Sequence, residues 1–139
     1  MASVEAIFVC PGRGAPMETC RRAVALEDWG LQGCAHARPG RKRQVLFVSA
    51  DHLDAVGVEP GTIRENVTVA RADVQAWPIG QRLRAGDAVF EVTMVCDPCE
   101  RMDAIRPGLR TELEGRRGML ARIVAGGELA VGDTLELVD

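Results

Sequence analysis

The stretch Val89-Phe90-Glu91-Val92-Thr93-Met94-Val95 alternates between apolar and mixed positions. On an extended chain Phe90, Val92 and Met94 share one face, and the charged Glu91 lies on the other. This period of two predicts a half-buried β-strand.

Similar runs recur along the chain, separated by Pro-Gly and Gly-Asp turns. Helical patterns are short: one follows a possible N-cap at Ser49 and ends at Gly57, and one covers Glu100–Arg106, where Pro107 stops it. Many short strands with frequent turns predict an all-β fold, closed or nearly closed into a β-barrel, with one or two short helices. The other predicted strands lie near Val4–Cys10, Ala23–Glu27, Gln44–Ser49, Asn66–Val69, Met119–Val124 and Leu135–Val138.

Length and charge limit the class of protein. The 139 residues predict a single domain that spans 1–139. Seventeen Lys and Arg against 20 Asp and Glu give a net charge of −3, which argues against a nucleic-acid-binding surface. No segment approaches the roughly 20 apolar residues of a transmembrane helix, and no basic region opens a signal peptide. We therefore expect a cytoplasmic protein that contacts neither nucleic acid nor membrane.

The five cysteines are Cys10, Cys20, Cys34, Cys96 and Cys99. An odd number in a chain of this size favours reduced thiols over a disulfide framework. Cys96 and Cys99 follow the strand at 89–95 directly, in a turn constrained by proline. They can form a redox dithiol, half of a zinc site, a structural pair, or one functional cysteine beside an incidental neighbour.

A glycine-rich loop, Gly30-Leu31-Gln32-Gly33-Cys34-Ala35-His36, supplies a further thiol and an imidazole. Cys34 and His36, added to Cys96 and Cys99, formally make a Cys₃His set for tetrahedral zinc. One interpretation is therefore a small non-catalytic module whose cysteines are structural or bind zinc.

Arg64 and Asn66 lie two residues apart, just after the Pro60-Gly61 turn. Residues at this spacing on an extended segment point to the same side. The two side chains can donate hydrogen bonds to a phosphate or to the edge of a heteroaromatic ring. Alternatively, Asn66 only closes a turn at the entry to a strand.

The order of the motifs resembles a known family. In chain order they are Gly30-Leu31-Gln32-Gly33-Cys34-Ala35-His36, Arg43-Gln44-Val45, Glu65-Asn66-Val67-Thr68, Gly86-Asp87, Pro98-Cys99-Glu100-Arg101, Gly115-Arg116-Arg117-Gly118 and Val131-Gly132-Asp133. This ordered set resembles the MOSC domain, the C-terminal domain of molybdenum-cofactor sulfurases, which also occurs as stand-alone bacterial proteins. The resemblance runs from about Val4 to Val138. It implies a barrel of the pyruvate-kinase-barrel-like type that binds the molybdenum cofactor (molybdopterin).

The hallmark cysteine of the family falls on Cys99. In sulfurase-like members it is proposed to carry a persulfide to the cofactor, and in the mitochondrial amidoxime-reducing component a matching cysteine binds molybdenum. The resemblance thus implies sulfurtransferase-like activity or molybdenum-dependent reduction of N-hydroxylated compounds, with carriage of cofactor or sulfur without turnover as an alternative. It also implies that Arg64, Asn66, Ser49 and His36 contact the pterin or its phosphate.

One position departs from the family pattern, because Cys34 stands where the family usually has an aspartate. The change removes a carboxylate and adds a second thiol. The sequence holds no counterpart of the sulfurase's pyridoxal-phosphate domain, so we do not expect this domain itself to bind pyridoxal phosphate. A partner in trans, either a cysteine-desulfurase-type sulfur donor or an electron-transfer protein, is expected to supply sulfur or electrons.

Overall fold

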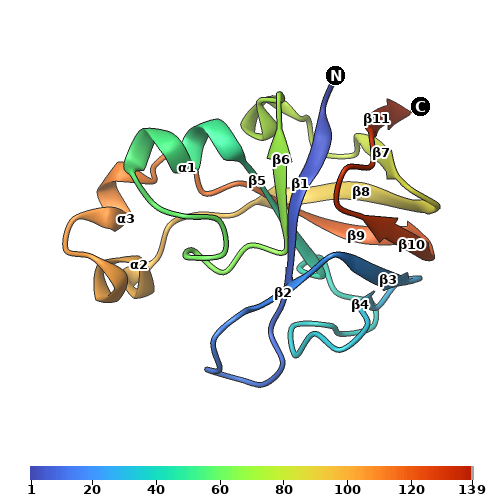
Figure 1. Cartoon of the computed structure of the whole chain (residues 1–139), viewed down its shortest axis with the longest axis horizontal. Coiled ribbons are helices and arrows are strands. Elements are labelled where there is room, and N and C mark those ends of the chain that lie inside the picture. The colour runs from blue at the N-terminus through green and yellow to red at the C-terminus, as the bar shows by residue number, and fades with distance from the viewer. Residues whose placement is uncertain (139) are drawn as a thin grey trace.

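The computed structural model describes residues 1–138 and contains a large sheet, a small sheet and three short α-helices (Figure 1). The helices are α1 (Ala50–Val56), α2 (Glu100–Ile105) and α3 (Leu109–Glu112), with a 3₁₀ turn η1 (Val74–Ala76). The strands are β1 (Ser3–Val9), β2 (Glu18–Cys20), β3 (Arg22–Leu26), β4 (Gly30–Leu31), β5 (Val45–Ser49), β6 (Val67–Ala70), β7 (Arg82–Ala85), β8 (Ala88–Val95), β9 (Met119–Ala125), β10 (Gly127–Ala130) and β11 (Leu135–Val138). Among residues 1–138, no helix is long and apolar enough to cross a membrane.

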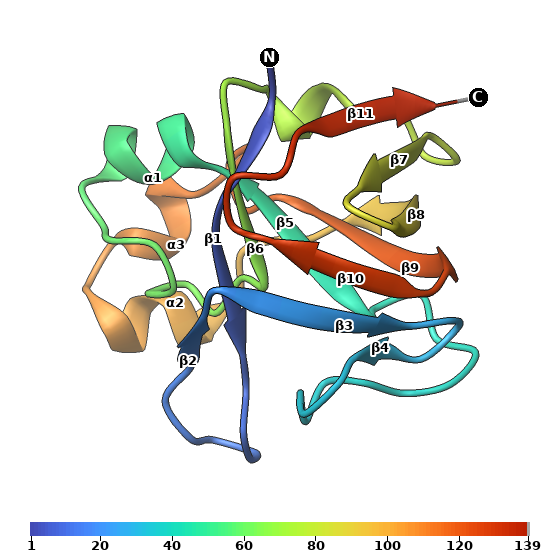
Figure 2. The same cartoon turned by 45° about the vertical axis from the view of Figure 1, so that its right-hand side comes forward.

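The eight strands of the large sheet lie in the order β11-β7-β8-β9-β5-β6-β1-β2, and only β5 and β6 run parallel. The small sheet, in the order β10-β3-β4, stands beside it (Figure 2). Both sheets are open, so the mostly-β prediction is confirmed but closure into a barrel is not. Val4 meets the turn before β11 through two backbone hydrogen bonds, to Asp133 and from Gly132, and this contact does not extend into a ladder between β1 and β11.

The strand predicted from alternation is β8. Phe90 and Val92 are buried, as their face requires, and the Phe90 ring packs edge-on against Phe47 with centroids 5.1 Å apart. The pairing of β8 with β9 shifts register between Val92 and Met94. Such a bulge bends a strand and re-aims the side chains beyond it. It moves the end of β8 toward the helices, where the Cys96–Cys99 loop begins.

Strand β5 is buried on both faces. Val45 and Phe47 pack in a core between the sheets, whereas Leu46 and Val48 pack in a second core under the helices. A run of four apolar residues is therefore required here rather than an alternating pattern. The three helices gather on one side of the large sheet and cover this second core (Figure 1).

Helix α1 begins and ends where the sequence predicts. Gly57 terminates it with φ 73°, a left-handed conformation that glycine adopts without strain. Ser49 occupies the N-cap position, but its side chain does not cap the helix. Its hydroxyl instead donates to Ala72 O (2.8 Å) and accepts from Val74 N–H (2.8 Å). The predicted side-chain cap is therefore wrong, because the β6–η1 connection uses the same oxygen.

Two Gly-Asp turns that look alike in the sequence have different positions in the fold. Gly86-Asp87 closes the β7–β8 hairpin, whereas Gly132-Asp133 carries the chain from β10 in the small sheet to β11 in the large one. The Asp133 carboxylate accepts from Ala130 N–H at 2.8 Å and so stabilises the second turn. The similar sequences of the two turns therefore gave no sign that the second turn joins strands of different sheets.

Candidate functional site

Cys99 ends a short loop between β8 and α2. Its carbonyl accepts the Met102 N–H (3.0 Å), and its side chain makes no capping hydrogen bond to α2. The residue is partly buried against the second core. Among residues 1–138, hydrogen bonds to cysteine sulfur involve Cys10, Cys34 and Cys96, with a weak one from the Cys20 thiol, but none involves Cys99. Its sulfur therefore makes no hydrogen bond within residues 1–138.

The neighbouring Cys96 is fixed in place. Its N–H donates to Gly118 O (3.0 Å), and its sulfur accepts from Arg117 Nη1 (3.2 Å). Arg117 is buried and also donates from Nε to the Met102 sulfur (3.4 Å). Burial raises the pKa of the Cys96 thiol, although the Arg117 and Arg43 charges oppose that shift. Cys96 is therefore held mainly as a neutral, structural thiol.

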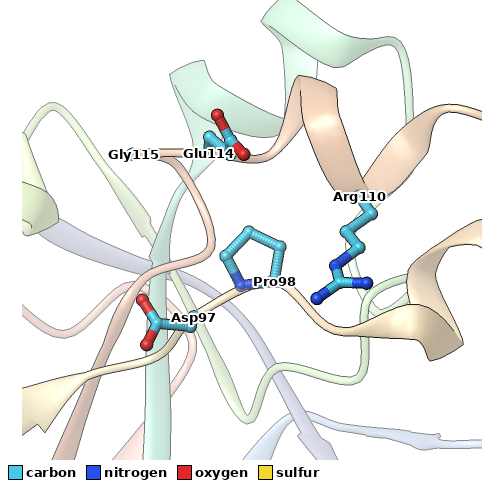
Figure 3. Close-up of a pocket in the computed structure, with 5 residues that line it drawn as sticks. All are labelled: Asp97, Pro98, Arg110, Glu114 and Gly115. Atoms are coloured by element: carbon cyan, nitrogen blue, oxygen red, sulfur yellow. The ribbon is translucent and has the colours of Figure 1, made fainter.

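A pocket of about 330 Å³ opens beside this loop (Figure 3). Arg110 of α3 extends on one side of Pro98, and the carboxylates of Asp97 and Glu114 lie on the other side (Figure 3). Gly115 completes the lining. The pocket therefore offers both a guanidinium and carboxylates within reach of the segment that carries Cys99.

A second group of polar side chains surrounds Cys10 and Cys34, far from the loop in sequence. The Cys34 sulfur accepts from Cys10 N–H (3.4 Å) and from Asn66 Nδ2 (3.6 Å). The Cys10 thiol donates to Gly12 O (2.9 Å), and its sulfur accepts from Arg64 Nη2 (3.1 Å). The Cys34 sulfur therefore accepts hydrogen bonds, whereas the Cys10 thiol accepts one and donates another.

The pKa of the Cys34 thiol falls from its usual 9.0 to about 7. Burial on its own raises this pKa, but hydrogen bonds from the His36 side chain and from the backbone of Cys10 and His36 lower it further than burial raises it. Hydrogen bonds to the charged form favour that form. Near neutral pH, Cys34 is therefore divided between thiol and thiolate.

Arg64 connects this cysteine group to an open groove. Its backbone has φ 66°, a left-handed conformation that is uncommon for a residue with a side chain. The groove has a volume of about 440 Å³. Cys99 precedes the first residue of α2, and Ile105, the last residue of α2, lines the groove together with Arg64. The other lining residues are Phe8, Pro16, Met17, Thr19, Pro60, Gly61 and Thr62.

Glu65, Asn66 and Thr68 of the family motif are buried and bonded within the protein. Asn66 Oδ1 accepts from Leu46 N–H (3.0 Å), and its Nδ2 donates to Phe8 O (3.1 Å), so one amide joins β6 to β5 and β1. Glu65 Oε2 accepts from Gly61 N–H (2.9 Å) and from the Thr68 hydroxyl (3.0 Å). Burial raises the pKa of Glu65, and its Oε1 has no partner within residues 1–138. The motif thus clamps the turn that presents Arg64.

The predicted site residues fall into three places. His36, Arg64 and Asn66 come together around the Cys10–Cys34 pair, whereas Cys99 lies at the other end of α2. Ser49 lies in a third place, away from both the cysteine pair and Cys99, and both hydrogen bonds of its hydroxyl hold the β6–η1 connection. Contact of these residues with a cofactor stays a prediction.

The zinc interpretation is wrong. Among residues 1–138, no three His, Cys, Asp or Glu side chains come close enough to hold a metal ion. Cys34 belongs to the core between the sheets, and Cys96 and Cys99 belong to the core under the helices. The two halves of the formal Cys₃His set are therefore separated by the large sheet.

Sequence reasoning missed Cys10 and gave Arg117 no role. Cys10 follows the last residue of β1 and precedes Pro11, so its position after a strand was readable from the sequence, but its proximity to Cys34 depends on tertiary contacts. Arg117 lies between two glycines in the quoted motif. Gly118 there has φ 101°, and a Cβ on it would stand 2.1 Å from Phe47 O, so this glycine permits the close approach of the chain to β5.

Comparison with solved structures shows the same fold in bacterial proteins. The YuaD protein from Bacillus subtilis superposes with a TM-score of 0.82 at 18% identity, over 99% of this chain and 96% of that one. YiiM from Geobacillus stearothermophilus gives 0.79 at 17% identity, over 100% of this chain and 76% of that one. YiiM from Escherichia coli gives 0.75 at 18% identity, over 99% and 70%. Identities this low show a shared fold alone.

Comparison with the curated proteins gives no match. The family model for the MOSC domain matches residues 35–136, which include His36, the Glu65–Thr68 motif and Cys99. The match covers well over half of the chain and agrees with the ordered motifs, so the chain belongs to the MOSC domain family.

Proposed function

We propose that this domain binds the molybdenum cofactor and that Cys99 provides the reacting thiol, as a persulfide carrier or as a molybdenum ligand. The observation that carries the proposal is the contrast within one loop. Cys99 is partly exposed and its sulfur makes no hydrogen bond within residues 1–138, whereas Cys96, three residues earlier, is buried and bonded to Arg117. Both proposed roles require an available thiolate.

The side chains near Cys99 suit the chemical parts of such a cofactor. A thiolate is a soft ligand, which fits molybdenum bound through sulfur. Guanidinium groups bind phosphate in a bidentate manner, and Arg64 and Arg110 each line a hollow to which the Cys99 segment or its helix contributes. Bound there, the cofactor would supply a metal centre for oxygen or sulfur transfer.

The chain's own residues have separate tasks in this proposal. Arg117 holds Cys96 and thereby fixes the start of the loop, so that Cys99 is presented by a rigid backbone. Arg64 and His36 are proposed to bind the pterin or phosphate from the groove side. Asn66 and Ser49 stay proposed as weaker contacts of the cofactor, although their hydrogen bonds in this structure go to the backbone. Sulfur or electrons are proposed to come from a partner protein.

The test is elemental analysis combined with persulfide detection. The protein is purified without oxygen from a host that makes the cofactor, as wild type, Cys99→Ser and Cys20→Ser. We expect molybdenum or a persulfide on Cys99 in the wild type and in Cys20→Ser, and neither in Cys99→Ser. Equal molybdenum and equal sulfur loading in all three proteins would contradict the proposal.

The outcome also separates the two roles of Cys99. Stoichiometric molybdenum that disappears in Cys99→Ser favours a metal ligand, and assays of N-hydroxylated substrates follow from it. A persulfide without retained molybdenum favours a sulfur carrier. Circular dichroism of Cys99→Ser controls for folding, which we expect to be unchanged because this thiol has no bonded partner.

A further inference from the structure

Cys10 and Cys34 form a second thiol centre that the proposed function does not use. Cys10 directly follows β1 and Cys34 lies in the loop after β4, and the two residues meet through two contacts. Cys10 N–H donates to the Cys34 sulfur (3.4 Å), and Cys10 O accepts from Ala35 N–H (2.6 Å). These contacts hold the Cys34 sulfur against the Cys10 backbone, so the two cysteines are direct neighbours in the fold.

The hydrogen bonds give the two sulfurs different chemical characters. Cys34 Sγ accepts from Cys10 N–H (3.4 Å) and from Asn66 Nδ2 (3.6 Å), as suits a thiolate. Cys10 donates its S–H to Gly12 O, as suits a protonated thiol. A thiolate beside a thiol is the arrangement in which one sulfur attacks an oxidant and the other resolves the product.

Access to the pair restricts the oxidant. Cys34 is 7% exposed and Cys10 is fully buried, so a protein disulfide or a glutathione-sized molecule is excluded by size. The exposed Gln32, Gly33 and His36 flank Cys34 on its loop, so solvent lies close to this thiol. Hydrogen peroxide meets this limit and reacts with thiolates.

We propose that Cys10 and Cys34 are a peroxide-reactive dithiol in which Cys34 attacks and Cys10 resolves. In the first step the Cys34 thiolate forms an S–O bond and the O–O bond of peroxide breaks, so that hydroxide leaves, takes up a proton and becomes water. In the second step the Cys10 sulfur attacks Cys34, the S–S bond forms and the S–O bond breaks. The Cys10 proton and the leaving hydroxide give a second water. The thiols lose two electrons, and one peroxide is reduced to two waters.

This reaction is independent of Cys99 but has a consequence for the groove. Arg64 Nη2 bonds the Cys10 sulfur and also lines the groove. Formation of the disulfide removes the Cys34 thiolate charge and the Cys10 thiol at the same time. The centre therefore links the redox state of the pair to the guanidinium that is proposed to bind the cofactor.

Peptide mapping tests the proposal on the full reduced chain treated with hydrogen peroxide. Trypsin separates Cys10, Cys20 and Cys34 onto different peptides, because Arg13, Arg21 and Arg22 lie between them, and it leaves Cys96 and Cys99 together on another peptide. We expect a cross-link between the Cys10 and Cys34 peptides as the first product, roughly tenfold faster than oxidation of Cys20, whose pKa is raised. Cys20→Ser is the matched control and retains the cross-link.

Two variants identify the order of attack. Cys10→Ser is expected to stop at a sulfenic acid on Cys34 that dimedone traps, and Cys34→Ser is expected to leave Cys10 reduced. The proposal is overturned if the wild-type chain oxidises first at Cys96 and Cys99, or if Cys34 stays reduced. The wild-type map needs no variant to fold, and it reports on different peptides from those that test Cys99.

Discussion

Cys34 and Cys96 are each 7% exposed, and yet burial has opposite outcomes for them. The pKa of Cys34 falls to about 7, whereas the pKa of Cys96 rises. Cys34 accepts hydrogen bonds from Cys10 N–H and from Asn66 Nδ2, and the nearby His36 also favours its thiolate. Cys96 accepts one from Arg117 and lies near the acidic Asp97.

The comparison teaches that exposure alone does not predict which cysteine is reactive. Removal from water disfavours a thiolate at both positions, and the difference comes from the donors directed at the sulfur. At Cys34 several short-range hydrogen bonds outweigh the cost of burial. At Cys96 the positive charges of Arg117 and Arg43 do not, and Cys99 and Asp97 act against them.

The largest expected effect is on the Cys34 side. Asn66→Ala removes the partner of Leu46 N–H and of Phe8 O, both of which lie inside the fold. Leaving a buried backbone group unpaired costs about 1–3 kcal/mol, so we expect a loss of about 4 kcal/mol in the free energy of unfolding. Urea denaturation measures it. The exposed Gln32→Ala on the neighbouring loop is the control, with an expected change within about 0.5 kcal/mol. Equal values for both variants would show that Asn66 does not join the strands.

The second effect is a pH dependence of the free energy of unfolding that comes from Cys34 and is absent from Cys34→Ser. Its folded pKa, about 7, lies below the usual 9.0, so its stabilisation is complete above pH 9 and is lost as the pH falls through 7. The wild type should therefore gain up to about 3 kcal/mol over Cys34→Ser between pH 6 and pH 9. The other groups that face this sulfur, His36, Cys10, Arg64 and Cys20, are present in both proteins. A difference that does not change with pH would refute the lowered pKa.

The third prediction compares the two thiols directly. At pH 7 about half of Cys34 is thiolate, and alkylation requires the thiolate. We expect iodoacetamide to label Cys34 at least about tenfold faster than Cys96, since equal exposure removes access as an explanation. Peptide mass spectrometry reads both rates in one sample. Arg117→Met should slow the alkylation of Cys96 further and leave the alkylation rate of Cys34 unchanged. Similar alkylation rates for the two thiols in the wild type would contradict the prediction.

The smallest effect concerns a buried group beside Arg117. Burial raises the pKa of Glu65, so its carboxyl destabilises the fold as the pH rises above 4.5 and the unfolded chain ionises first. Glu65→Gln keeps an acceptor for Gly61 N–H and for Thr68 and removes the charge. We expect the free energy of unfolding of Glu65→Gln to lack the decline that the wild type shows on going from pH 4 to neutral pH. Parallel pH profiles for the two proteins would contradict it.

Much of the fold was predictable because its signals are local. The alternation in β8, the apolar run of β5 and the glycine that ends α1 each depend on neighbours along the chain, and the structure confirms these elements. The short strands β2 and β4 and helix α3 were missed, since elements of two to four residues carry little periodicity. The open sheets were not predicted either, because the passage of β10 into the small sheet is set by its pairing with β3.

The candidate site likewise has features that the sequence predicts and features that depend on tertiary packing. Motif order predicted Cys99, Arg64 and His36 as site residues, but the sequence could not show that Asn66 and Ser49 form their hydrogen bonds with the backbone. That information depends on which strands lie beside them. The Cys10–Cys34 contact could not be predicted for the same reason, because it depends on which segments pack together.

Strand β5 packs in both cores, and this has a consequence for how the molecule unfolds. If β5 leaves the sheet, the core under the helices and the core between the sheets both lose buried side chains. Unfolding of this strand therefore disrupts both layers at once. The thiol centre at Cys34 and the loop at Cys99 therefore belong to one cooperative unit. Ligand binding at either place should protect the amides of β5 from hydrogen exchange, and the two chemistries should lose their native environment in a single transition.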